Sequence, residues 1–257
     1  MNNPNNNNLN FFNKDDWIWY PFLSMAKSKI SQIGAYELSV PLDFLNKDAL
    51  IGTESRPIRV KTLTWACRTQ KLSKVRAACV YADKIASVLN LLAIPNSSFD
   101  LPFFGVDLVT LPTGHLLALD LQPVLKNDRF HTEKVWNSLA LIHSKWKDYF
   151  PDGGAIPEEA KQYFSPGFLW TKLPICSNSE KLIRTKLIHA YEEYLDFYLE
   201  LVRSAEEVSQ ERSISLRQGQ ERYMRYRIEK DPARKMLTAF YGNNWTESYI
   251  RDFLFDI

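Results

Sequence analysis

The sequence predicts an α+β protein built as a three-layer α/β/α sandwich, with a central antiparallel sheet flanked by helices. Three observations predict it. One helical pattern comes first, several strand-like patterns follow, and the rest of the chain is mostly helical. The most apolar stretch is typical of a hairpin with two apolar faces, so the sheet must be covered on both sides. The hydrophobic fraction, 45%, and the charged fraction, 24%, are those of a globular protein.

The chain is expected to begin with a disordered tail and to continue as one domain. Residues 1–14 are rich in Asn and too polar to form a core. Residues 15–257 are predicted to form the single domain, because no long linker or repeat interrupts them. Its first element is an amphipathic helix within residues 15–33, with Asp15 or Asp16 as the N-cap.

Strands are expected in the next third of the chain. Residues 55–70 alternate and are rich in β-branched side chains, which is typical of a strand, and residues 71–82 show a similar pattern. Residues 86–95, "ASVLNLLAIP", fit a strand or a helix. The stretch "FDLPFFGVDLVTLPTGHLLALDLQP" is predicted to be a hairpin. Its apolar runs, Phe103–Leu111 and His115–Leu121, flank a three-residue turn, Pro112-Thr113-Gly114.

The remainder of the chain is predicted to be mainly helical. In the longest helix, over residues 179–208, apolar side chains recur at steps of three and four, which is the period of a buried helical face. A short strand is expected within residues 165–175. The other helices are expected at residues 130–150, at residues 215–229, and twice within residues 231–257, where Gly242 separates the two.

Composition excludes several classes of protein. The net charge of +2 is too small for general binding to nucleic acid. No apolar run approaches the length of a membrane span, and the uncharged start lacks the features of a signal peptide, so a cytoplasmic protein is expected. Cys67, Cys79 and Cys176 are far apart and the histidines are scattered, so we expect free thiols and no metal site. No Gly-x-Gly occurs, so no nucleotide fingerprint is present.

Three polar residues in apolar or capping positions are candidate site residues. Asp107 lies between Val106 and Leu108, where it is either an acceptor for backbone donors near the turn or a buried proton donor. Burial would raise the pKa of such a donor. Asp231 precedes Pro232, a pattern typical of a helix N-cap. Asn90 is predicted to be a core amide or, alternatively, a substrate contact.

Basic residues gather around Asp231, which leaves two interpretations open. They form either a solvated helix face or a surface for carboxylates of a ligand and for an acidic partner. The six residues are Arg222, Arg225, Arg227, Lys230, Arg234 and Lys235.

The chain resembles the ferredoxin-dependent bilin reductases from about Trp17 to its C-terminus. The motifs "FDLPFFGVDLVTLPTGHLLALDLQP", "YFSPGFLW" and "EKDPARKMLTAFYG" carry the resemblance in order and spacing. It implies an α/β/α sandwich with the bilin between the sheet and the C-terminal helices. It also implies that no flavin, nicotinamide or metal is bound, and that reduced ferredoxin, as an external donor, passes electrons one at a time to the tetrapyrrole. The branch that it resembles most reduces 15,16-dihydrobiliverdin at the A-ring diene to (3Z)-phycoerythrobilin.

The resemblance also implies roles for individual residues. Asp107 and Asp231 match the proton-donating aspartates on the sheet side and the helical side of the pocket. Arg227 would orient Asp231 or a propionate. Asn90 stands where relatives with a four-electron reaction carry a histidine, and Ala78 lies near the place of their glutamate, so Asn90 is expected to be a substrate contact.

Partners and rival functions follow from the same resemblance. Ferredoxin and 15,16-dihydrobiliverdin are the expected partners, together with a transient contact with the preceding reductase of the pathway. The protein is expected to be a monomer, and neither nucleic acid nor a membrane is expected as a partner. The alternatives are a sister reductase that acts on biliverdin, by the 15,16-reduction or by both steps, and a non-catalytic bilin carrier.

Overall fold

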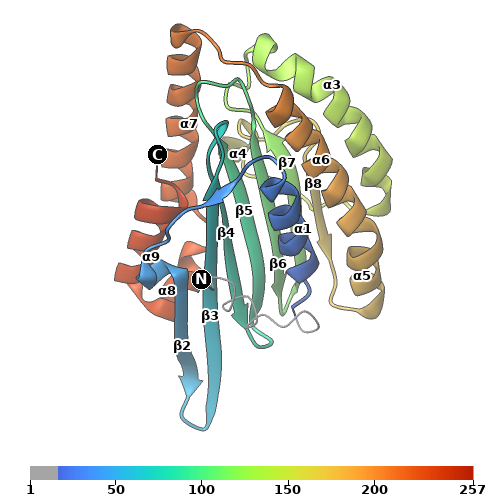
Figure 1. Ribbon diagram of the computed structural model, residues 1–257. Helices are drawn as coiled ribbons and strands as arrows, with labels where there is room; N and C mark the ends of the chain where they lie inside the picture. Colours follow the sequence, from blue (N-terminus) through green and yellow to red (C-terminus); the bar gives the residue numbers. More distant parts are fainter. Residues whose placement is uncertain (1–16, 257) are drawn as a thin grey trace.

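The computed structural model describes residues 17–256, within which eight strands form one antiparallel sheet between two layers of helices (Figure 1). The predicted three-layer α/β/α class is confirmed. The predicted tail, residues 1–14, and the predicted caps Asp15 and Asp16 lie outside the described residues. The first helix begins at Tyr20, with Trp19 in the N-cap position.

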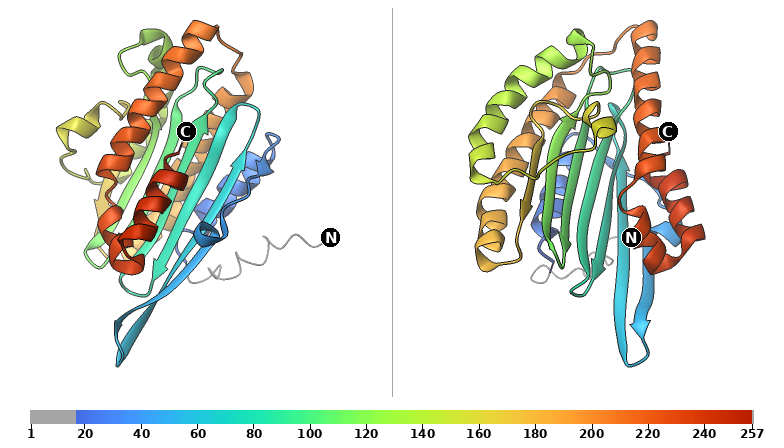
Figure 2. Two further views of the ribbon diagram at one scale, coloured as in Figure 1. Left: turned by 90° about the vertical axis from the view of Figure 1, so that its left-hand side faces the viewer. Right: turned by 180° about the vertical axis from the view of Figure 1, so that it is seen from behind.

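The sheet follows the chain almost strand by strand. Its order is β1-β3-β4-β5-β6-β7-β8, and β2 pairs with the same strand, β3, as β1 does. Figure 2 shows the β2–β3 hairpin extending beyond one end of the sheet. The strands are β1 (Tyr36–Glu37), β2 (Asn46–Thr53), β3 (Arg56–Arg68), β4 (Leu72–Ala82), β5 (Ala86–Pro95), β6 (Phe103–Leu111), β7 (Gly114–Gln122) and β8 (Leu169–Leu173).

The helices of the chain divide between the two faces of the sheet. Alternate side chains of each strand point to opposite faces, so each face needs its own helical cover. The helices are α1 (Tyr20–Ser31), α2 (Leu42–Leu45), α3 (Arg129–Trp146), α4 (Glu158–Lys161), α5 (Ser177–Leu182), α6 (Ile188–Ser204), α7 (Gln210–Lys230), α8 (Arg234–Tyr241) and α9 (Asn243–Tyr249), with the 3-10 turn η3 (Lys147–Tyr149) and the π-helical turns η4 (Ile183–Leu187) and η5 (Ile250–Leu254).

One face of the sheet is a dry core. Helices α1, α3 and α6 cover it, and Phe104 packs there against Tyr198 with ring centroids 5.3 Å apart. The apolar period predicted for the long helix is confirmed, because Tyr191, Tyr194 and Tyr198 are each at most 1% exposed. That helix is divided, however: the π-helical turn η4 joins α5 to α6, and α6 ends at Ser204.

The other face is covered by the C-terminal helices α7, α8 and α9, which lie across the sheet in the views of Figure 2. Helix α7 begins at Gln210, five residues earlier than predicted, because Ser209 caps it by accepting a hydrogen bond from the Arg212 amide. Helix α8 ends as predicted at Gly242, whose φ of +82° favours glycine.

The central strands were predicted correctly and the first edge was not. Residues 86–95 form a strand, which settles the alternative that the pattern left open. The hairpin turn is shorter than predicted, since Leu111 pairs with Gly114 across two residues only. Elements β1, α2 and β2 were missed, because β2 is exposed along most of its length and its apolar residues do not alternate.

Candidate functional site

A row of side chains crosses the sheet on the face that α7 covers. The register aligns Ala78 of β4 with Asn90 of β5, then with Asp107 of β6 and Ala118 of β7. Directly opposed residues of an antiparallel sheet present their side chains on the same face. Ala78 belongs to the core beneath the C-terminal helices, so the predicted residues Asn90 and Asp107 face those helices as well.

Asn90 and Asp107 form the first contact of the site. The amide nitrogen Nδ2 of Asn90 donates a hydrogen bond to Oδ1 of Asp107. The amide oxygen Oδ1 of Asn90 accepts one from the guanidinium of Arg76 on β4. Asn90 therefore links a buried cation to the carboxylate, and its partners lie within the site rather than in an ordinary core.

Arg227 on α7 joins the two predicted aspartates. Its Nη1 lies 4.0 Å from Oδ2 of Asp107, and its Nη2 donates a 3.0 Å hydrogen bond to Oδ2 of Asp231. Burial acts to lower the pKa of Arg227, but electrostatic interactions with Tyr223, Asp231 and Asp107 and the hydrogen bond to Asp231 outweigh it and raise the pKa above its ordinary value. The guanidinium stays cationic, donates a hydrogen bond to Asp231 and lies near the carboxylate of Asp107.

Asp231 ends α7 and turns its side chain inward. Its Oδ1 accepts a 2.8 Å hydrogen bond from the Ala233 amide, and its side chain is 4% exposed. The prediction that Asp231 starts the next helix directly is wrong, since α8 begins at Arg234 and Pro232 lies in the connecting turn. Its bond to the backbone and its bond to Arg227 coexist, so Asp231 is connected to the site through Arg227, although Asp231 itself does not line the cavity described below.

Asp107 is more open than its apolar neighbours predicted. Its side chain is 41% exposed, so the expected burial is wrong, and its partners are the side chains of Asn90 and Arg227 rather than backbone donors. The strand buries Val106 and Leu108 on the dry face, while Asp107 faces a cavity on the other face. Successive side chains of a strand point to opposite faces of the sheet. The apolar neighbours Val106 and Leu108 therefore indicate that the opposite face is buried, and they say nothing about the face that carries Asp107.

The cavity lies between the sheet and α7. It contains about 300 Å³ of unfilled space, including its opening to solvent, and Asn90, Asp107 and Arg227 line it. Phe164 and Phe168 line it as well, with ring centroids 4.0 Å apart and planes 9° from parallel. Charged groups line two sides of this cavity and flat rings line a third.

Two charged lining residues escaped the sequence analysis. Arg76 is 1% exposed and was overlooked inside a strand. Asp120, also in the quoted hairpin, is 1% exposed, and burial raises its pKa to about 7 although hydrogen bonds from Ser165 lower it. The argument applied to Asp107, a carboxyl among apolar neighbours, describes Asp120. A search of the next strand for a carboxyl among apolar neighbours would have found Asp120.

The six basic residues do not form one cradle. Arg222, Arg225, Lys230 and Lys235 are exposed to solvent, and Arg227 alone lines the cavity. Arg234 joins α8 to α7 through a 3.1 Å hydrogen bond to the Glu229 carbonyl, and to α9 through a 2.6 Å hydrogen bond to Glu247. The solvated-face interpretation is confirmed for the four exposed residues, and the interpretation as a surface for ligand carboxylates and an acidic partner stays a prediction.

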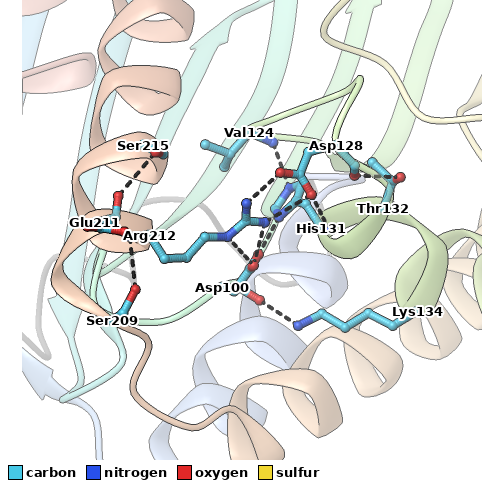
Figure 3. A network of polar contacts seen from close by, with 10 residues as sticks. All are labelled: Asp100, Val124, Asp128, His131, Thr132, Lys134, Ser209, Glu211, Arg212 and Ser215. Carbon is cyan, nitrogen blue, oxygen red and sulfur yellow. Dashed lines mark hydrogen bonds and ion pairs between the residues drawn. The ribbon is translucent and has the colours of Figure 1, made fainter.

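A second polar network lies near the start of α7 (Figure 3). Asp100 accepts hydrogen bonds from His131 of α3 at 2.5 Å and from Arg212 of α7 at 2.8 Å. Arg212 also contacts Asp128, the N-cap of α3, at 2.5 Å. The network ties α3 and α7 to the segment that enters β6.

Residues 17–256 contain no group of three or more His, Cys, Asp or Glu side chains arranged to hold a metal ion. In the same range no helix has the length and apolar content to cross a bilayer. Cys67 and Cys79 are buried as free thiols, as expected, whereas the free Cys176 is exposed.

Comparison with known proteins gives a consistent result. The family model described as "Ferredoxin-dependent bilin reductase" matches residues 23–256. A phycoerythrobilin:ferredoxin oxidoreductase of Synechococcus sp. (strain RCC307) is 52% identical over 257 residues, which cover 100% of this chain and 98% of the relative. One of Prochlorococcus marinus (strain MIT 9211) is 49% identical over 100% of both chains. The crystal structure of phytochromobilin synthase from tomato in complex with biliverdin shares the fold, with a TM-score of 0.78, 23% identity, and coverage of 92% of this chain and 82% of that one.

Proposed function

The chain belongs to the ferredoxin-dependent bilin reductase family, and from this premise we propose that it reduces 15,16-dihydrobiliverdin at the A-ring diene to (3Z)-phycoerythrobilin. The observation that carries the proposal is the identity of about half of all residues, over the whole chain, to relatives named phycoerythrobilin:ferredoxin oxidoreductase. The polar row that faces α7 supplies the groups that such a reaction needs.

The reaction adds two electrons and two protons to the substrate. Reduced ferredoxin supplies the electrons one at a time, and the conjugated tetrapyrrole accepts them, so the proposal needs no resident redox group. Each electron adds negative charge that a proton must balance. Asp107 would donate one proton from the sheet and Asp231 the other from the end of α7. Both carboxylates then regain protons from solvent.

The side chains between the two acids bind and orient. Arg227 reaches both carboxylates and stays charged, so it can move between Asp231 and an acidic or carbonyl group of the bilin. Asn90 presents an N–H group beside Asp107 but carries no proton that it could transfer, so we assign it to substrate binding. Phe164 and Phe168 would pack against the flat pigment.

The exposed cations at the end of α7 are proposed to receive ferredoxin. Arg222, Arg225 and Lys230 project from the helix that also carries Arg227, which keeps the incoming electron close to the cavity. A cationic surface steers an acidic partner and makes the encounter sensitive to salt. We further propose a cytoplasmic monomer that receives its substrate from the preceding reductase.

An anaerobic assay with reduced ferredoxin and each bilin in turn tests the proposal. Turnover of 15,16-dihydrobiliverdin to phycoerythrobilin, with biliverdin left unchanged, is the expected result. Turnover of biliverdin alone would assign the chain to a sister reaction. Tight binding of both bilins without turnover would instead favour a carrier.

A further inference from the structure

Arg76 is a buried charge in the cavity wall that the proposed reaction does not use. It is 1% exposed and lines the cavity from β4. Burial of a guanidinium is costly unless its hydrogen bonds are satisfied. The bonds that satisfy it therefore show what this charge holds in place.

Arg76 makes contacts in two directions. Toward the C-terminus, its Nε donates a 3.1 Å hydrogen bond to the carbonyl of Leu254, and its guanidinium lies 5.1 Å from the centre of the Phe255 ring. Toward the site, its Nη1 donates to the side-chain oxygen of Asn90 and, at 3.3 Å, to the carbonyl of the same residue. The second set of bonds reaches a residue that touches Asp107.

The contact with Arg76 decides which end of the Asn90 amide meets Asp107. A guanidinium has donors only, so it can bond the amide oxygen and not the NH₂ group. With its oxygen held by Arg76, Asn90 must present Nδ2 to Oδ1 of Asp107. An amide turned the other way would set its NH₂ donors against the donors of Arg76, and its oxygen against the acceptor oxygen of Asp107.

The two oxygens of Asp107 are consequently not equivalent. Oδ1 accepts the amide hydrogen bond, whereas Oδ2 lies 4.0 Å from Arg227, which is beyond hydrogen-bond distance. A proton on Oδ1 would compete with the N–H group that already points at it. Oδ2 is the oxygen that can hold a proton without losing a bond.

We propose that Arg76 is a positioning residue for the proposed reduction: it fixes the Asn90 amide, and thereby makes Oδ2 of Asp107 the oxygen that delivers the proton. In the step, the O–H bond at Oδ2 breaks and the proton passes to the bilin that has accepted an electron from ferredoxin. The carboxylate left behind is reprotonated from solvent through its exposed side. The inference rests on the proposed function, because it specifies how one of its two acids works.

A double-mutant cycle on turnover tests whether Arg76 acts through Asn90. Loss of a hydrogen bond to a charged group corresponds to roughly 10–100-fold, so Arg76→Met and Asn90→Leu should each lower kcat by about that factor. The double variant should be no slower than the slower single variant, because without the amide there is nothing for Arg76 to orient. Multiplicative losses would overturn the inference.

Lys74→Met is the matched control. Lys74 stands two residues before Arg76 on the same strand and bonds the Phe253 carbonyl at 2.5 Å, so it anchors the same C-terminal segment without touching Asn90. Its kcat should stay within about twofold of wild type while its stability falls. An equal loss of kcat in Lys74→Met would show that Arg76 acts through the segment alone.

The pH profile of kcat gives a readout that a structural role would not move. Without Arg76 the amide can turn its oxygen toward Asp107, which disfavours the ionised carboxylate. The alkaline limb should then move to higher pH in Arg76→Met and stay in place in Lys74→Met. If Arg76→Met does not fold, Arg76→Lys replaces it, because an ammonium lacks the fork that reaches Asn90 and Leu254 together.

The wild-type assay separates the two proposals. Absence of wild-type turnover with 15,16-dihydrobiliverdin would reject the proposed function. Normal wild-type turnover with independent effects of Arg76 and Asn90 would reject only the role given to Arg76.

Discussion

Two aspartates of one motif, seven residues apart, take part in two very different polar networks. Asp100 is 3% exposed, and His131 and Arg212 donate to its two oxygens (Figure 3). Nε2 of His131 accepts the Val124 amide at 3.0 Å, so its Nδ1 carries the hydrogen and donates to Asp100. The side chain of Asp107 is 41% exposed and one of its oxygens has no hydrogen bond among the described residues.

The difference separates a structural carboxylate from a reactive one. A saturated buried network gains nothing from a ligand and loses much if one member is removed. A carboxylate with one free oxygen facing a cavity can still take a proton or a substrate contact. The unbonded oxygen and the greater exposure distinguish Asp107 from Asp100, whereas both oxygens of Asp231 accept hydrogen bonds, as those of Asp100 do.

The largest effect is expected at the acids of the site. Asp107→Asn and Asp231→Asn should each lower kcat by roughly 100- to 10,000-fold, the usual contribution of a general acid, while the bilin still binds. Anaerobic turnover and bilin absorbance titrations measure the two quantities. Asp83→Asn, at an exposed position of the β4–β5 turn, is the control and should retain full activity. Wild-type turnover in either acid variant would remove that residue from the mechanism.

Removal of Asp100 should damage stability instead of chemistry. Asp100→Ala leaves Arg212 and His131 without their shared partner, which should cost roughly 3–5 kcal/mol in the free energy of unfolding. Urea denaturation measures the loss. Asp196→Asn, which breaks only the exposed pair with Lys29, should cost less than about 1 kcal/mol. Equal losses in the two variants would mean that the network around Asp100 is no stronger than a surface pair.

Stability should depend on pH in opposite senses at Asp100 and Asp120. At Asp100 burial acts to raise the pKa, but hydrogen bonds from His131 and Arg212 outweigh this effect, so the pKa is lowered. The contribution of Asp100 to the free energy of unfolding is therefore present at neutral pH and is lost in acid. Burial raises the pKa of Asp120 to about 7, so a penalty develops above pH 4 and is complete above pH 7.

The Asp120 penalty amounts to roughly 4 kcal/mol, for a shift of about three pH units. Asp120→Asn should therefore flatten the decline in unfolding free energy between pH 4 and pH 8, measured by urea denaturation across that range. Asp152→Asn, at an exposed site, should leave the slope unchanged. A slope that persists in Asp120→Asn would place the titrating group elsewhere.

The smallest effect is expected at the exposed cations of α7. Reversal of charge in Arg222→Glu with Arg225→Glu should raise the KM for ferredoxin several-fold at low salt and leave kcat nearly unchanged. The difference from wild type should shrink as salt is added. Lys181→Glu, on α5, should have no effect. An unchanged KM in the double variant would move the ferredoxin surface away from α7.

Strands were predicted correctly from the sequence where the apolar residues of the local pattern are also the buried residues of the structure. Strands β3, β4, β6 and β7 were identified because alternating, β-branched and apolar runs mark a sheet covered on both sides, whereas the pattern of β5 also fitted a helix. Prediction failed for β2, whose exposed residues carry no such pattern. Asn90, Asp107 and Asp231 were singled out as polar residues in apolar or capping positions, and the family motifs supplied the roles proposed for them and for Arg227. Arg76 was missed, because an arginine in a strand is ordinarily a surface residue and its position is inside only when α7 and the C-terminal segment cover it.

The amino-acid sequence alone determined the layered α/β/α class, the central strands and the family, because these depend on apolar period and on short motifs. Only the tertiary structure decided which of Asp107 and Asp120 is buried. Both lie among apolar neighbours in adjacent strands and on the same face of the sheet. Burial depends on what packs above that face, and Ser165 and its loop cover Asp120 whereas Asp107 opens to the cavity. Contacts across 45 residues of chain are invisible to any local pattern.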